Sequence, residues 1–289
     1  MEPARVVPRR IWRDGSPSVG SRSIPEETAV ALTYNGGTYA VMMTTPRDLE
    51  DFAVGFSLSE GVISSSADID SLDVLPLDGG VELRMWLTKP KADRLQTRRR
   101  HIAGPTGCGL CGIESIAEAI RPPAIIGPGR QFSPEQIMVA MQSLPSRQKL
   151  NIETRAVHAA AFWNAAGGIV GLREDVGRHN ALDKLSGALA RASVAVGDGI
   201  ILLTSRISVE MVQKSAAIGA PVMVSVSAPT ALAVRMADAA GITLAAIARA
   251  DGFEVFTHPL RISDGFAAIS HCACAQPHDA SSAIAGRVN

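Results

Sequence analysis

The sequence has no long apolar run, no excess of charge of one sign and few cysteines. No window reaches the run of about 18 apolar residues that a membrane helix needs, so we expect no membrane span. The 28 basic and 28 acidic residues cancel, which argues against a protein held on nucleic acid by its overall charge. Four cysteines in 289 residues do not make a disulfide framework.

The two ends of the chain differ in composition from its middle. Residues 1–25 are rich in Arg, Pro and Ser and contain no apolar stretch of the kind found in a secretory signal. We therefore expect a flexible tail over residues 1–24 and a cytoplasmic protein, whose thiols stay reduced. Residues 263–289 are rich in Ala and Ser and form a second tail without a clear pattern. The patterned residues 25–262 between them are expected to hold the core.

The part of the chain up to about residue 150 predicts a hairpin and helices. The β-rich runs Glu27–Thr33 and Thr38–Met43 flank an Asn-Gly-Gly turn sequence. Thr45 is followed by a proline, which predicts a helix capped by Thr45 and ending at Gly61. Ser133 and the glutamine three residues later form the pattern of a capping box, which predicts another helix start.

After about residue 150, apolar strand-like runs alternate with helical segments. The expected strands cover residues 156–163, 168–172, 199–204, 221–226, 242–248 and 252–257, and the expected helices cover 180–192, 209–218 and 230–239. Such alternation predicts an α/β fold in which helices cover the faces of a sheet.

The chemistry is expected at two cysteines, Cys108 and Cys111, which three glycines surround. Glycine permits unusual backbone angles and close approach by another molecule. The loop leads directly into a predicted helix at Ile113, and the N-terminus of a helix stabilises a thiolate. Arg98–Arg100 and His101 lie just upstream and add positive charge. The pattern favours a reactive thiol, suited to sulfur transfer or redox chemistry.

Other readings of a Cys-x-x-Cys pair remain open at this point. A structural zinc site needs four ligands, but the other cysteines, Cys272 and Cys274, lie in the unpatterned tail, and no histidine has the usual paired spacing. A thioredoxin-like site would need a preceding βαβ unit. A zinc nucleobase deaminase would need a Glu two residues after its histidine and a Pro before the first cysteine. In this sequence Ala160 stands two residues after His158, and Gly107 precedes Cys108, so neither requirement is met.

Several separated motifs together resemble one family. The loop Gly107-Cys-Gly-Leu-Cys-Gly112 is similar to the signature loop of the formate dehydrogenase accessory sulfurtransferases, the FdhD/NarQ family. The resemblance covers about residues 25 to 262, and the further blocks that carry it are Phe52 to Gly61, His158 to Ala160, Glu174 to Lys184, Thr204 to Glu210, Gly219 to Pro221, Ser225 to Pro229 and Phe256 to Arg261.

The resemblance implies a function. Family members take persulfide sulfur from a cysteine desulfurase and deliver it to the molybdenum (or tungsten) bis-guanine-dinucleotide cofactor of formate dehydrogenase. The cofactor is cargo, and no metal of the protein's own is implied. The family fold is similar to that of cytidine deaminase, a mixed α/β sheet covered by helices, here with an N-terminal β-hairpin and helix portion. Members form homodimers.

The resemblance also implies roles for particular residues. Cys108 matches the persulfide-bearing cysteine and Cys111 its partner. The segment that would help to hold the cofactor consists of Phe256, Thr257, His258, Pro259, Leu260 and Arg261. Their chemistry makes Arg178, Arg206 and Arg261 candidates for binding the phosphates of the cofactor, because guanidinium groups bind phosphate through paired hydrogen bonds. Two alternatives remain: a cofactor-binding chaperone without sulfur chemistry, and a zinc-dependent hydrolase on a deaminase-like scaffold.

Overall fold

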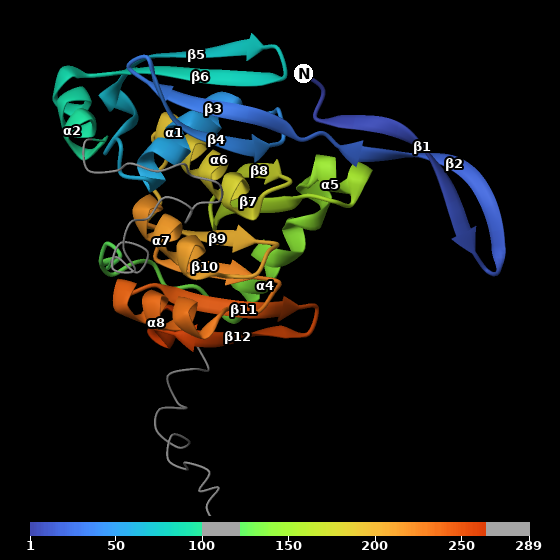
Figure 1. Cartoon of the computed structure of the whole chain (residues 1–289). Helices are drawn as coiled ribbons and strands as arrows, with labels where there is room; N and C mark the ends of the chain where they lie inside the picture. Colours follow the sequence, from blue (N-terminus) through green and yellow to red (C-terminus); the bar gives the residue numbers. More distant parts are fainter. Residues whose placement is uncertain (100–121, 264–289) are drawn as a thin grey trace, which may run out of the picture.

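Two sheets and the helices packed on them form the body of the protein (Figure 1), in a computed structural model that describes residues 1–99 and 122–263. A separate two-stranded ribbon projects from this body. The architecture is mixed α/β, as the sequence predicts. The finer expectation, a likeness to cytidine deaminase, stays a prediction.

The first sheet is built from the N-terminal part of the chain. Its strands are β3 (Thr28–Tyr34), β4 (Gly37–Thr44), β5 (Ile69–Leu77) and β6 (Gly80–Leu87), in the order β4-β3-β6-β5. Strands β3 and β4 pair antiparallel, which confirms the predicted hairpin, whereas β3 and β6 run parallel. Apolar residues of this sheet and of helix α1 (Leu49–Ser59) are buried in one common cluster.

The second sheet has six strands in the order β12-β11-β10-β9-β7-β8. They are β7 (His158–Asn164), β8 (Gly168–Asp175), β9 (Gly199–Leu203), β10 (Val222–Ser225), β11 (Thr243–Arg249) and β12 (Gly252–Thr257). Strands β9, β10 and β11 are parallel, and β7 is antiparallel both to β9 and to β8. Strand β8 therefore points the same way as β9, and their carboxyl ends share one edge.

Helices cover both faces of the second sheet. They are α4 (Pro134–Ser143), α6 (Arg178–Arg191), α7 (Val209–Ile218) and α8 (Ala231–Ala240). Alternate residues of β9 join different clusters: Ile201 and Leu203 pack with α6, α7 and α8, whereas Ile200 and Leu202 pack with α4. A strand buried on both faces needs a continuous apolar run. None of the described helices is long and apolar enough to cross a membrane.

The first helix begins later than the sequence predicts. The predicted cap was Thr45, but Asp48 precedes the first helical residue, Leu49. The Thr45 hydroxyl does not cap a helix because it accepts a hydrogen bond from the backbone N–H of Val176, 3.2 Å away. A contact between segments distant in sequence thus overrides the local capping signal. The predicted end holds, since Gly61 adopts a positive φ of 67° just after the helix.

Residues that we expected to form a flexible tail are paired strands in the structure. Strand β1 (Ala4–Arg13) pairs antiparallel with β2 (Ser16–Pro25), and the ribbon extends away from the body (Figure 1). Asp14 and Gly15 form its two-residue turn, both with positive φ. Asp-Gly is a preferred hairpin turn, so a signal was present and the Arg- and Pro-rich composition obscured it.

Among the strands and α-helices of the described residues, three more were not predicted: strand β5, helix α2 (Lys89–Arg99) and the short helix α5 (Lys149–Thr154). The backbone N–H groups of Leu150 and Asn151, at the start of α5, donate to the carboxylate of Glu174, 2.9 and 2.8 Å away. Helix α5 thus depends on a residue of β8 that local sequence does not reveal. The predicted helix at Ile113 and residues 264–289 of the predicted C-terminal tail, 263–289, lie outside the described residues.

Helices α1 and α6 approach each other closely where both carry glycine. A Cβ atom on Gly187 would lie 1.9 Å from the carbonyl oxygen of Asp51 and 2.8 Å from the backbone nitrogen of Gly55. A Cβ atom on Gly55 would lie 1.7 Å from the carbonyl oxygen of Asp183. The obstructing atoms belong to backbone, so the helices would have to move apart to admit a side chain. The crossing therefore requires glycine on both helices.

We expect Gly187→Ala to destabilise the fold by at least about 1 kcal/mol, since overpacking a core usually costs about 1–3 kcal/mol. Urea unfolding measures the change. Gly197→Ala is the matched control, because a Cβ atom there would meet nothing within 4 Å. If both variants unfold at the same urea concentration as the unsubstituted protein, helices α1 and α6 do not approach each other as closely as described.

Candidate functional site

The predicted catalytic residues, Cys108 and Cys111, lie outside the described residues and stay predictions. The predicted cofactor-binding residues all lie inside them. The structure divides this second group between two opposite edges of the six-stranded sheet. One edge is formed by the carboxyl ends of the parallel strands, and the other by their amino ends.

Arg178 and Arg206 lie at the edge formed by the carboxyl ends of β8 and β9. Arg178 is the first residue of α6, which follows β8. Arg206 is exposed in the segment between β9 and α7. No hydrogen bond or ion pair of either guanidinium group is found among the described residues, and the Nε atom of Arg178 is buried. In open α/β sheets this edge is where ligands usually bind.

Two histidines lie at the same edge. His158 begins β7 opposite Asp175 at the end of β8. His179 Nε2 lies 3.1 Å from the Glu210 carboxylate, which also accepts a hydrogen bond from the Ser208 hydroxyl at 2.9 Å. Pairing with His179 lowers the pKa of Glu210 despite its partial burial. A carboxylate that stays charged holds this imidazole in place.

Burial lowers the pKa of His158, and the positive charge of Arg178 lowers it further, while Asp175 opposes the shift. His158 is therefore neutral at pH 7 and has a nitrogen lone pair free to accept a proton or hydrogen bond. Among the residues that the structure describes, no three His, Cys, Asp or Glu side chains gather as a metal site.

The segment from Phe256 to Arg261 lies at the opposite edge, because β12 runs antiparallel to β11 and ends beside its start. The Arg261 guanidinium donates to the carbonyl oxygens of Gly241, at 2.7 Å, and Gly127, at 3.0 Å. The His258 ring is bonded to the Asp238 carbonyl oxygen at 2.8 Å. These polar side chains hold the segment on the body, whereas Phe256 and Leu260 are exposed.

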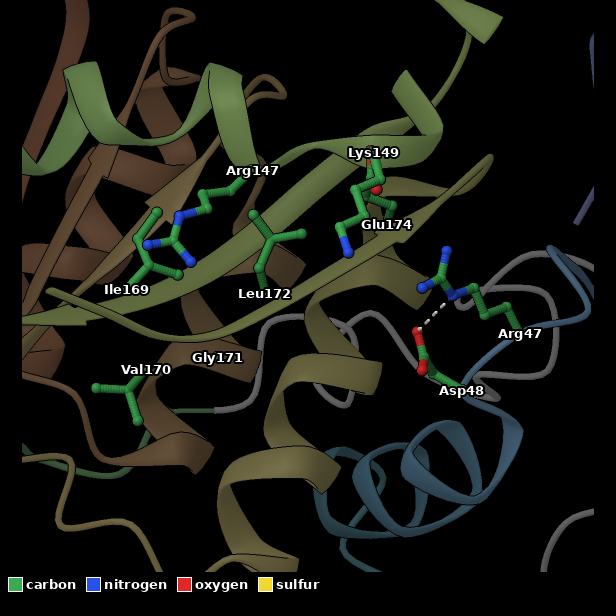
Figure 2. A pocket seen from close by; sticks show the side chains of 9 residues that line it. All are labelled: Arg47, Asp48, Arg147, Lys149, Ile169, Val170, Gly171, Leu172 and Glu174. Atoms are coloured by element: carbon green, nitrogen blue, oxygen red, sulfur yellow. Dashed lines mark ion pairs between the residues drawn. The ribbon is translucent and has the colours of Figure 1, made fainter. Parts of the chain in front are cut away.

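A cavity of about 270 Å³ lies beside strand β8, away from these residues. Figure 2 shows the side chains around it. Consecutive residues from Ile169 to Leu172 border one side, and none of the residues predicted from the sequence to act in the site lines it. The remaining lining residues are charged: Arg47, Asp48, Arg147, Lys149 and Glu174.

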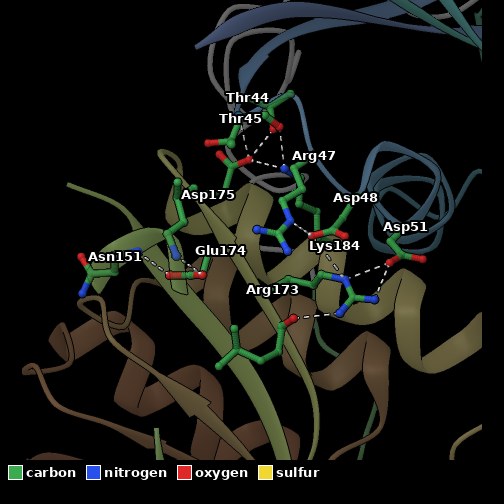
Figure 3. A network of polar contacts seen from close by, with 12 residues as sticks. Thr44, Thr45, Arg47, Asp48, Asp51, Asn151, Arg173, Glu174, Asp175 and Lys184 are labelled. Atoms are coloured by element: carbon green, nitrogen blue, oxygen red, sulfur yellow. Dashed lines mark hydrogen bonds and ion pairs between the residues drawn. The ribbon is translucent and has the colours of Figure 1, made fainter. Parts of the chain in front are cut away.

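A buried network fixes the turn from β8 into α6 (Figure 3). Lys184 Nζ lies 2.6 Å from Asp175 Oδ2, and both side chains are fully buried. Lys184 also donates to the Thr45 carbonyl oxygen at 2.8 Å, and the Thr45 N–H donates to Asp175 at 3.0 Å. The other Asp175 oxygen accepts from the Gly177 N–H at 2.7 Å. Because Arg178 and His179 follow this turn, the network sets their positions.

Lys184 and the threonines at the end of β4 were not predicted as site residues. Thr44 and Thr45 donate to Asp175 from the side chain and the backbone respectively. The sequence contained one signal: Lys184 stands between Ala181, Leu182 and Leu185, on the buried face of a helix. A lysine in such a position needs a buried partner.

We expect Arg178→Ala to raise the pKa of His158, because it removes a nearby positive charge. Burial still acts in the variant, so the pKa is expected to stay below the ordinary value of about 6.5. Titration of the imidazole signals by NMR measures both values. Arg235→Ala, on the exposed face of α8, is the control, and an unchanged His158 pKa in Arg178→Ala would contradict the proposed proximity.

Comparison with known proteins agrees with the motifs. The FdhD/NarQ family pattern matches residues 25–263. The chain is 51% identical over 259 residues to the sulfur carrier protein FdhD of Agrobacterium fabrum, covering 89% of this chain and 96% of that protein. It is 48% identical over 251 residues to the protein of the same name from Cupriavidus necator, covering 87% of each.

A solved structure from Desulfotalea psychrophila, described as that of a formate dehydrogenase accessory protein, superposes with a TM-score of 0.73. The two sequences are 25% identical, and the match covers 90% of this chain and all of the other. The family match extends over most of the chain and includes both edges of the six-stranded sheet. The chain therefore belongs to the FdhD/NarQ family.

Proposed function

We propose that this protein is a sulfur carrier that serves formate dehydrogenase. The proposal rests on family membership and on relatives named as sulfur carriers that are about half identical in sequence. The motif Gly107-Cys-Gly-Leu-Cys-Gly112 supplies the chemical group that such a carrier needs. A sulfur carrier needs reduced thiols, which favours a cytoplasmic location.

In this proposal Cys108 is the sulfur acceptor. Its thiolate attacks the outer sulfur of a persulfide on a cysteine desulfurase, the bond between the two donor sulfurs breaks, and the donor leaves as a thiolate. Cys108 then carries the sulfur as a persulfide. Cys111, three residues further on, either releases that sulfur by forming a disulfide with Cys108 or helps to retain it.

The sulfur is passed to a molybdenum bis-guanine-dinucleotide cofactor, which is cargo. One observation supports binding of this polyanion most directly: Arg178 and Arg206 lie at the carboxyl edge of the sheet, and neither forms a hydrogen bond or ion pair with an acidic side chain among the described residues. Guanidinium groups bind phosphate through paired hydrogen bonds. Neutral His158 beside them can accept a proton.

The segment Phe256 to Arg261 is proposed as a second contact for the same cofactor. Its polar side chains hold the protein's own backbone, so its exposed side chains are the ones offered to a ligand. Phe256 presents an aromatic ring on which a guanine base can stack, since every base has a π-face. A cofactor with two dinucleotide arms has two polar ends, which suits contact regions at two edges. A homodimer, as in other family members, is part of the proposal.

We expect incubation with a cysteine desulfurase and cysteine to add one sulfur atom to the peptide that carries Cys108. Mass spectrometry detects the added atom. Cys108→Ala should abolish the gain and the maturation of formate dehydrogenase, whereas Cys272→Ala should keep both. Persulfide formation and enzyme maturation that survive in Cys108→Ala would favour a passive cofactor chaperone.

We expect Arg206→Ala to weaken binding of GDP, used as a probe for one arm of the cofactor, by about tenfold, as for the loss of one charged hydrogen bond. Isothermal titration calorimetry measures the affinity. Arg206 is exposed, so the fold should be unaffected, and Arg235→Ala is the matched control. If Arg206→Ala binds GDP as well as the control does, this arginine is not part of the cofactor site.

A further inference from the structure

Strand β8 is the last strand of the six-stranded sheet, and its outer edge borders the charged cavity of Figure 2. We propose that this edge binds an acidic, extended segment of a partner polypeptide, which adds to the sheet as a further strand. Its backbone would pair with residues 168–172, and its carboxylates would meet Arg47, Arg147 and Lys149. The inference is independent of the cysteine chemistry proposed above.

The outer edge of β8 has no strand partner among the residues that the structure describes. Strand β7 pairs with its inner edge only. The Leu172 carbonyl oxygen already accepts one hydrogen bond, from the side chain of Arg173 at 2.8 Å, and keeps a second lone pair for an added strand. Val170 lies at an irregularity of the pairing and remains 44% exposed. Unpaired N–H and C=O groups along the edge of a strand are a template for another strand.

The edge is free over only part of the strand. At its carboxyl end, Arg173 binds Asp51 at 2.6 Å, Glu174 holds the start of α5, and Asp175 belongs to the buried network. The stretch 168–172 makes no comparable contact with another element on its outer side among the described residues. It spans about 17 Å at the usual rise of a strand, enough for about five residues of an added strand.

The positive side chains around the cavity favour a partner that carries negative charge. Arg147 and Lys149 are exposed and have no acidic partner within 4.0 Å among the described residues, and Arg47 has only Asp48, at 3.9 Å. Both lining carboxylates already have partners: Glu174 accepts two backbone N–H groups, and Asp48 also lies 3.7 Å from Arg173. Three cations with few counter-charges repel one another, and an acidic ligand would relieve that repulsion.

The shape of the cavity favours an extended chain over a compact anion. Side chains of a strand alternate between its faces, so a cavity bordered by four consecutive residues, Ile169 to Leu172, follows the edge of the strand. Arg147 lies near Ile169, whereas Arg47 lies at the far end, beyond Glu174 (Figure 2). Cations spread along a free edge match carboxylates spaced along a strand, and strand addition uses this combination of backbone pairing and side-chain selection.

The test uses the full chain and the peptide acetyl-Glu-Val-Glu-Val-Glu-amide with a fluorescent label. We expect saturable binding by anisotropy and slower amide hydrogen exchange at residues 168–172. The double variant Arg147→Glu, Lys149→Glu should weaken binding at least about tenfold, because reversed charges repel the peptide. Arg10→Glu, Arg235→Glu, two exposed sites elsewhere, is the control with a matched number of charge reversals and should bind normally.

Four results would overturn the proposal. They are no binding of the acidic peptide, equal binding of the corresponding Lys-Val peptide, displacement of the peptide by an equal concentration of inorganic pyrophosphate, and a change in the sedimentation of the double variant by itself. The third would indicate a site for compact anions, and the fourth an interface with a second copy of the chain. Persulfide loading of Cys108 in the double variant should be normal, so failure here is distinguishable from failure of the sulfur-carrier function.

Discussion

The structure depends most on one buried ion pair, that between Asp175 and Lys184. Neither side chain is exposed to solvent, and a buried charge is tolerated only when it is paired and hydrogen-bonded. The Asp175 carboxylate meets this condition with donors from β4, from the turn after β8 and from α6. The Lys184 ammonium group also binds the Thr45 carbonyl oxygen. Removing one partner would leave the other charge buried alone, which typically costs about 3–5 kcal/mol. The pair thus ties the N-terminal sheet to the six-stranded sheet.

Other contacts at the same junction also hold the N-terminal part of the chain against the six-stranded sheet and its helix α6. Asp51 of α1 binds Arg173 of β8 and Arg191 of α6, at 2.6 and 2.5 Å. The glycine crossing of α1 and α6 allows the backbones to approach closely enough for these contacts. Helix α6 is therefore held along much of its length, and its first turn carries Arg178 and His179. A proposed ligand contact on such a rigid element costs little ordering when the ligand binds, which favours affinity.

Sequence patterns predicted the elements whose signals are local. The capping box at Ser133 is present with both hydrogen bonds, and α7 and β12 have the predicted bounds. The predictions failed where a distant partner decides the structure: Thr45 bonds Val176 instead of capping a helix, and α5 is held by Glu174. For the candidate site, Arg178, Arg206 and Arg261 were predicted together as phosphate-binding residues; the first two share an edge, and Arg261 lies at the opposite one. The separation of the first two from the segment Phe256 to Arg261 follows from the antiparallel pairing of β12, which spacing along the chain does not encode.

The same junction explains why β8 offers an edge over part of its length only. Its last three residues bind α1, α5 and the buried network, so no added strand can reach them without breaking those contacts. Its residues from Ile169 to Leu172 border a cavity that is also lined by cations from two separate segments. One strand therefore combines two features: a carboxyl end that fixes the turn leading to Arg178, and an amino-terminal part that is open. A partner bound to the open part would lie on the same strand that positions the proposed cofactor site, which gives it a short physical connection to that site.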